Sequence, residues 1–322
     1  MPYTHTVLLT GGTSGLGYRA ALVIAQKHPE YQVVITGRSD PDSAAQKINN
    51  KLKQGNVSFL ALDLSTTAKV RDFAESWATK NYPPIISLVL NAGTQFVGPM
   101  ALNDEGYEMT FMVNHLGHAL LFHLLTPYLA PDARIVITSS GTHDPVLTQK
   151  NNLPDATFTT AEELAHPNPE TAHPEGMQRY NSSKLANILW TYALARHLAD
   201  KGSSITATTY NPGLMFGTGL GRDWKPFSRF FWFHILPIFT PLIRLLMPFV
   251  RSVQESSVDL AWLATSPDVA GVSGKYFDCR KQVMSSPLSN DEAKQEDLWN
   301  WTVKTAGFEG DGLDGLKNLS QK

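Results

Sequence analysis

The sequence predicts an α/β fold in which helices cover both faces of a doubly wound parallel sheet. Three observations support this prediction. Short apolar runs alternate with helical segments, the runs are continuously apolar rather than alternating, and a glycine-rich turn joins the first run to the first helix. The 322 residues, of which 42% are hydrophobic and 17% charged, suit a single domain spanning 1–322 with a substantial core.

The elements are expected in strict alternation. The first strand covers residues 6–9, and "LGYRAALVIAQKH" after the glycine turn has helical spacing. Later strands are expected at 32–36, 57–61, 85–90, 134–140, 204–210 and 274–278. Helices are expected at 42–54, 67–80, 103–130, 181–201, 252–265 and 290–306. In such sheets ligands bind beyond the carboxyl ends of the strands.

Three regions depart from this rhythm. Residues 141–179 are rich in proline, histidine, asparagine and threonine, and they predict a long irregular insertion. Residues 281–322 form an expected C-terminal helical extension. Residues 214–250 are expected to form a substrate lid, because 226–250 are strongly apolar and aromatic. A bilayer-spanning helix is excluded by interrupting residues, namely Arg229, Pro237, Pro241, Arg244 and Pro248. The alternatives to a lid are an interfacial membrane patch and an oligomer contact.

The glycine turn is the first candidate binding element. "LLTGGTSGLG" places Gly11, Gly15 and Gly17 between a strand and a helix. Such a turn aims backbone N–H groups and a helix N-terminus at one point, which suits a phosphate group. The alternative is a tight turn that binds nothing.

Polar residues follow several of the expected strands. Arg38 after the second strand suits an extra phosphate, where an acidic residue would instead hold a ribose diol. Asp63 follows the third strand and is alternatively a helix N-cap. Asn114 lies inside an apolar helix and needs buried partners. Other candidates at strand ends are "NAG" (91–93), Ser139 and Ser140.

Tyr180 and Lys184 stand at i and i+4 of one expected helix, so their side chains are neighbours. A phenol normally loses its proton near pH 10, and a nearby ammonium group favours the phenolate. A tyrosine tuned in this way can exchange a proton with a carbonyl oxygen. On most helices, however, such a pair is simply solvated.

The order of these motifs resembles the short-chain dehydrogenase/reductase superfamily from about residue 5 to 280. The glycine turn, Asp63, "NAG", Asn114, Ser140, Tyr180/Lys184 and "NPG" (211–213) carry the resemblance. "FMVNHLGHALL", "YNSSKLANIL" and "NPGLMFGTGL" are similar to its retinol-dehydrogenase-like and protochlorophyllide-reductase-like branch. The resemblance implies a Rossmann-type fold.

The resemblance also implies roles for individual residues. Tyr180 is the proton donor or acceptor, Lys184 lowers its pKa and bonds the nicotinamide ribose, and Ser140 rather than Ser139 holds the substrate oxygen. Asn114 anchors a water relay to Lys184. The residues that the resemblance places along the cofactor, besides Tyr180 and Lys184, are Gly11, Thr13, Ser14, Gly15, Leu16, Gly17, Arg38, Asp63, Leu64, Asn91, Ala92, Gly93, Pro212, Gly213, Leu214 and Thr218.

The chain departs from the family pattern at three points. The gap between Ser140 and Tyr180 is unusually long. Leu214 stands where protochlorophyllide reductases carry a cysteine, which argues against light-driven reduction. No basic residue immediately precedes Gly15, so the expectation of NADP(H) depends on Arg38.

The expected function is an NADP(H)-dependent carbonyl reductase or alcohol dehydrogenase for a bulky apolar or aromatic substrate. The alternative is a nucleotide-sensing regulator or scaffold without turnover. A net charge of −2 gives no reason to expect nucleic acid, and the single Cys279 excludes an internal disulfide or a multi-cysteine metal site. We expect no metal, a cytoplasmic location without a signal peptide, and a possible homo-oligomer. Peripheral membrane contact through 226–250 is a further possibility.

Overall fold

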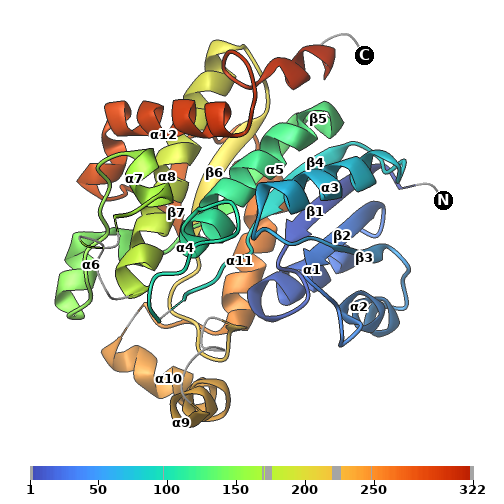
Figure 1. Ribbon diagram of the computed structural model, residues 1–322. Coiled ribbons are helices and arrows are strands. Elements are labelled where there is room, and N and C mark those ends of the chain that lie inside the picture. The colour runs from blue at the N-terminus through green and yellow to red at the C-terminus, as the bar shows by residue number, and fades with distance from the viewer. Residues whose placement is uncertain are drawn as a thin grey trace.

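The computed structural model describes residues 3–96, 98–168, 170, 176–219, 226–247 and 249–319. Its centre is an eight-stranded sheet in the order β3-β2-β1-β4-β5-β6-β7-β8, with helices on both faces (Figure 1). The strands are β1 His5–Thr10, β2 Tyr31–Gly37, β3 Val57–Ala61, β4 Ile85–Leu90, β5 Leu129–Thr138, β6 Thr206–Asn211, β7 Lys275–Asp278 and β8 Lys281–Val283. The predicted doubly wound α/β fold is confirmed.

The sheet is parallel from β3 to β7, as the continuous apolar runs predict. The exception is β8, which pairs antiparallel with β7 and was not expected. All three residues of β8 are exposed, so it lacks the apolar pattern of a buried strand. From β1 the chain adds β2 and β3 toward one edge of the sheet, and it then returns to place β4 on the other side of β1. The order in which strands are added therefore reverses between β1 and β4. A crevice for a ligand is expected at the carboxyl ends of these strands.

Two hydrophobic cores lie on opposite faces of the sheet. One core packs beneath α3, α5, α8 and α12, and the other beneath α1, α2 and α11. The bounds of these helices are α1 Gly15–Lys27, α2 Ala44–Leu52, α3 Thr67–Ala78, α5 Gly117–Leu125, α8 Gly176–Asp200, α11 Val253–Thr265 and α12 Glu292–Thr305.

The helix expected at 103–130 is shorter and is not uniformly α-helical. It comprises α4 Met109–Phe111, a π-helical turn Met112–Leu116, α5, and a 3₁₀ turn Thr126–Tyr128. Residues before it are not helical because the Asn103 side chain accepts hydrogen bonds from the backbone N–H groups of Glu105 and Tyr107. The Glu108 carboxylate then caps α4 through the N–H of Phe111 at 2.7 Å.

The insertion 141–179 contains short helices that the sequence pattern did not predict. They are a 3₁₀ turn Gly141–His143, α6 Pro145–Lys150 and α7 Ala161–Ala165. Helix α8 begins at Gly176, earlier than the expected residue 181. Residues 169 and 171–175 of this insertion lie outside the described residues.

Two further segments complete the fold. Residues 226–246 form α9 Pro226–Phe230, a π-helical turn Phe231–Ile235 and α10 Leu236–Leu246, which project from one edge of the molecule (Figure 1). The expected C-terminal extension begins with β8 rather than with a helix. It continues through a 3₁₀ turn Pro287–Asn290, α12, and a final 3₁₀ helix Asp314–Leu319.

Candidate active site

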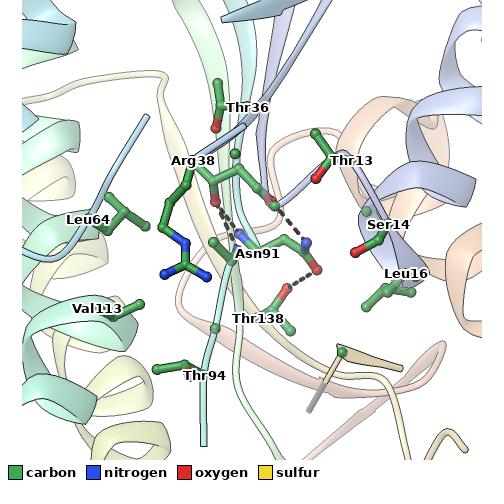
Figure 2. Close-up of a pocket in the computed structure, with 18 of the residues that line it drawn as sticks. Thr13, Ser14, Leu16, Thr36, Arg38, Leu64, Asn91, Thr94, Val113 and Thr138 are labelled. Atoms are coloured by element: carbon green, nitrogen blue, oxygen red, sulfur yellow. Dashed lines mark hydrogen bonds between the residues drawn. The ribbon is translucent and has the colours of Figure 1, made fainter. Parts of the chain in front are cut away.

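A cleft of about 550 Å³ opens at the carboxyl ends of the central strands (Figure 2). Its walls come from the turn after β1, the ends of β2, β3 and β4, helix α8 and the segment after β6. This is the position that the strand order predicts for a ligand. Figure 2 shows Arg38 reaching into the cleft beside Leu64, while Thr13, Ser14 and Leu16 form the opposite wall.

The glycine turn is shaped to leave one side open. Gly15 adopts a left-handed backbone (φ +55°), and a Cβ atom there would meet no other atom within 4 Å. Gly17 has the opposite constraint, since its Cβ would lie 2.2 Å from the carbonyl oxygen of Gly11. Ser14 caps α1 without a side-chain hydrogen bond to it. The N-terminus of α1 thus faces an unobstructed space, which fits a pyrophosphate.

A buried set of hydrogen bonds fixes the "NAG" turn to the end of β1. The Thr10 hydroxyl accepts hydrogen bonds from the backbone N–H groups of Asn91 (2.8 Å) and Ala92 (2.9 Å). It also lies 2.9 Å from Nε2 of His118, whose Nδ1 is 3.2 Å from the carbonyl oxygen of Asn114. Because a carbonyl only accepts, Nδ1 carries the proton and Thr10 donates to Nε2. Burial lowers the pKa of His118 to about 3, which keeps the ring neutral.

Asn114 lies in the π-helical turn and has the buried partners that its position requires. Its Oδ1 accepts from the N–H of Thr94 (2.8 Å), and its Nδ2 donates to the Thr94 carbonyl (2.9 Å) and to Ser183 Oγ (3.0 Å). Asn114 therefore clamps the segment after "NAG" to the helix that carries Tyr180. Its side chain makes no direct bond to Lys184, whose Nζ donates to the Thr138 carbonyl at 3.1 Å.

Tyr180 and Lys184 both line the cleft, and the ammonium of Lys184 lies 5.7 Å from the centre of the Tyr180 ring. Burial raises the pKa of Tyr180 to about 12, and a hydrogen bond with Ser140 opposes this rise. Burial also lowers the pKa of Lys184 to about 8. Burial therefore dominates the pKa of Tyr180, and the phenol holds its proton at neutral pH.

Ser140 is oriented from two sides. Its Oγ accepts hydrogen bonds from the N–H (3.2 Å) and the hydroxyl (3.0 Å) of Thr142, so its own proton is left for the hydrogen bond with Tyr180. Its carbonyl accepts from Nδ1 of His143 (2.7 Å), and Nε2 of His143 accepts from the N–H of Ser286 (3.1 Å). The C-terminal segment therefore supports the backbone of Ser140. Ser139 also lines the cleft, but its hydroxyl donates to the Lys184 carbonyl at 2.7 Å.

Arg38 and Asp63 lie toward the other end of the cleft. Asp63 accepts from the N–H of Ser65 (3.0 Å) and pairs with Lys69 (2.8 Å), and these bonds lower the pKa of its carboxyl group despite partial burial. Arg38 is exposed, and among the described residues it pairs with no carboxylate. A cation without a protein partner at this end of the cleft can bind a ligand anion.

The structure brings most of the predicted cofactor residues together, with several exceptions. Ser140 and Asn114 do not line the cleft themselves, although Ser140 is hydrogen-bonded to Tyr180, which does. Gly213 and Leu214 are also outside the wall, because Leu214 pairs instead with the backbone of Phe249 and Arg251 (3.0 and 2.9 Å). Among its described residues, the lid region 214–250 reaches the cleft through Met215, Thr218 and Gly219, which precede α9.

Several lining residues were not predicted from the sequence. They are Thr10, Thr36, Ser39, Asp40, Phe96, Met109, Val113 and Thr138, among others. Few of them could be predicted from local sequence patterns, because their approach to the cleft depends on the twist of the sheet and the course of loops. His118, which contacts Thr10 without lining the cleft, was also not predicted, although a histidine inside the apolar run "FMVNHLGHALL" suggests a buried polar role.

Sequence comparisons agree with this geometry. A family model described as short chain dehydrogenase matches residues 5–149, and one described as AcuH dehydrogenase domain matches residues 225–312. Human retinol dehydrogenase 14 is 32% identical over 320 residues, covering 94% of this chain and 86% of that protein. Human WW domain-containing oxidoreductase is 30% identical over 295 residues, covering 91% of this chain. The chain spans 66% of the length of that relative.

Solved structures show the same fold. A crystal structure of an uncharacterised Mycobacterium paratuberculosis protein superposes with a TM-score of 0.65, at 24% identity and 96% coverage of both chains. An NADPH-bound short-chain oxidoreductase from Pseudomonas aeruginosa has a TM-score of 0.61 at 18% identity, covering 86% of this chain and 96% of its own. With the retinol dehydrogenase match, these findings show that the chain belongs to the short-chain dehydrogenase/reductase family of oxidoreductases, in its retinol-dehydrogenase-like branch.

Proposed function

We propose that this protein is an NADP(H)-dependent reductase or dehydrogenase that acts on a bulky apolar carbonyl compound or its alcohol. The observation that carries the proposal is a single cleft with three features. It has open space at a helix N-terminus, an arginine at one end that pairs with no carboxylate of the described residues, and a tyrosine–lysine pair in its wall. The cofactor supplies the hydride, and the chain supplies position, charge and the proton.

The proposed cofactor fits the cleft at several points. The open side of Gly15 and the N-terminus of α1 would face the pyrophosphate. Arg38 would bind the 2′-phosphate that distinguishes NADP(H) from NAD(H). The nearby Asp40 carboxylate is occupied, because it accepts a hydrogen bond from the N–H of Ala44 at 2.7 Å. The NADPH of the Pseudomonas aeruginosa structure is consistent with this assignment.

The proton chemistry is assigned to Tyr180. With a pKa of about 12 its hydroxyl carries a proton at neutral pH, which suits donation to a carbonyl oxygen during reduction. The ammonium of Lys184, 5.7 Å from the ring centre, would stabilise the phenolate that remains. Ser140 would hold the same substrate oxygen by turning toward it the proton that it shares with Tyr180, because Thr142 already supplies both hydrogen bonds that Ser140 accepts. Apolar lining from Phe96, Met109 and Met215 favours a bulky apolar substrate.

The test is NADPH oxidation against a panel of aldehydes, ketones and quinones with Tyr180→Phe. We expect kcat to fall by about 10²–10⁴-fold while NADPH affinity is retained, because only the transferable proton is removed. Tyr192→Phe is the matched control, since Tyr192 lies on the same helix and its hydroxyl contacts Ser285 at 2.7 Å instead of the cleft. NADPH binding without turnover of any substrate would favour a regulatory protein. Near wild-type kcat in Tyr180→Phe would show that the assignment is wrong.

A further inference from the structure

Helices α9 and α10 and the π-helical turn between them present an exposed apolar face. Of the twelve large hydrophobic side chains that are exposed in the described ranges, eight lie on this segment. We call them the outer face: Phe227, Phe230, Phe231, Ile238, Phe239, Leu242, Leu245 and Leu246. Soluble surfaces scatter such residues singly, so a contiguous set marks an interaction site.

The opposite side of the same segment is already packed against the protein. Trp232 is buried against Phe216 and Val250, and its indole N–H donates to the Thr218 carbonyl at 2.9 Å. Arg244 donates to the Val250 carbonyl (2.9 Å) and binds the carboxylate of Glu255. These contacts orient the segment so that the outer face points toward solvent. The outer face therefore needs a partner from outside the molecule, and it does not line the cofactor cleft.

The charge of the segment points to the chemistry of that partner. From residue 224 to 254 the sequence contains no aspartate or glutamate, although the chain as a whole carries a net charge of −2. The same stretch contains four cations, Lys225, Arg229, Arg244 and Arg251. Of these, Arg244 and Arg251 bind carboxylates of α11. Because the carboxylates of Glu255 and Asp259 neutralise these two arginines, Lys225 and Arg229 are the cations of the stretch that would complement an anionic lipid surface beside the apolar face. A second copy of this face would instead bring like charges together.

The shape of the segment agrees with this choice. Figure 1 shows α9 and α10 projecting at the end of the molecule opposite the C-terminus. No helix among the described residues is long and apolar enough to cross a bilayer. We propose that the outer face docks the protein on the surface of an anionic membrane, with α10 lying in the interfacial region. This inference does not depend on the proposed reaction.

The experiment is cosedimentation of the full chain with phosphatidylcholine vesicles and with vesicles that also contain phosphatidylserine. We expect binding to the anionic vesicles, and binding about fivefold or more weaker to the neutral ones. The double variant Leu245→Glu/Leu246→Glu should bind anionic vesicles at least about tenfold more weakly. These side chains are 78% and 88% exposed, so the variant should fold normally, and circular dichroism checks this.

The matched control is Val146→Glu, which adds a carboxylate at a 73% exposed apolar position on α6 and should bind vesicles like the wild type. Wild-type protein that stays in the supernatant with anionic vesicles would overturn the proposal. Equal vesicle binding by the double variant and the control would overturn it too. A dimer in light scattering that the double variant dissociates, without vesicle binding, would assign the outer face to a second copy instead.

Discussion

Three buried histidines should make this protein sensitive to mildly acidic pH. His115, His118 and His123 are almost fully buried, and burial lowers their pKa values to about 4, about 3 and about 4. In the unfolded chain each titrates near 6.5. Because their folded pKa values are depressed, they stay neutral in the folded protein, while the unfolded state takes up protons below pH 6.5. Their contribution to stability is complete above pH 6.5 and is lost as the pH falls toward 4.

The size of the effect follows from proton linkage. Between pH 6 and 4 each histidine should reduce the free energy of unfolding by about 1.4 kcal/mol per pH unit, and the three together by roughly 4 kcal/mol per pH unit. On lowering the pH from 7.5 to 5.5 the loss is roughly 4 kcal/mol, which is a large part of a typical total stability of about 5–15 kcal/mol. Carboxyl groups with lowered pKa values, such as Glu255 at about 2, act in the same direction but at lower pH.

The assay is urea unfolding, followed by circular dichroism, in buffers between pH 7.5 and 5.0. His123→Phe should reduce the pH slope by about a third, because His123 packs among aromatic rings that include Phe308 and donates only to the Gly312 carbonyl. Phe308→Leu is the control, since it should lower the stability equally at every pH. A midpoint that does not change between pH 7.5 and 5.5 would refute the assignment of neutral buried histidines.

Three further predictions concern the cleft and its supports. Gly17→Ala should abolish NADPH binding in fluorescence titrations or prevent folding, because the new methyl group would overlap the carbonyl oxygen of Gly11. Arg38→Ala should remove an expected tenfold to hundredfold preference for NADP(H) over NAD(H); equal affinities in the wild type would contradict the role of this arginine. Asp259→Asn should lower the free energy of unfolding by about 2–4 kcal/mol, because the 5% exposed carboxylate binds two arginines. Unchanged urea midpoints would show that this cluster does not stabilise the fold.

Much of the fold could be predicted from the sequence because its elements carry strong local patterns. The strands of a parallel sheet are apolar throughout, and each prediction overlapped an observed strand. The predictions failed where local hydrogen bonds or pairing partners decide the structure. Asn103 holds the chain in turns before Met109, and β8 exists only because β7 offers it an edge.

The candidate site was predictable where the chemistry itself constrains the residue type. Glycines mark a close backbone approach, and a tyrosine four residues before a lysine marks a shared helix face. Their catalytic and binding roles remain predictions. Contacts across the chain were not predictable: Thr10 and His118 are separated by 108 positions and meet only in the folded core. Nor does the local sequence show that His143 would join Ser140 to Ser286.

The π-helical turn Met112–Leu116 has a consequence for insertions and deletions in this protein. A π turn holds about one residue more than an α turn, so deleting a single residue here would allow a regular α-helix to form. The helices on either side would keep nearly the same relative orientation, because a π turn with its extra residue and an α turn without it rotate the chain through nearly the same angle. The side chains inside the turn would change direction instead, so Asn114 would lose its hydrogen bonds to Thr94 and Ser183. The extra residue therefore sets the direction of the Asn114 side chain, and a one-residue deletion should release this clamp without breaking the helix.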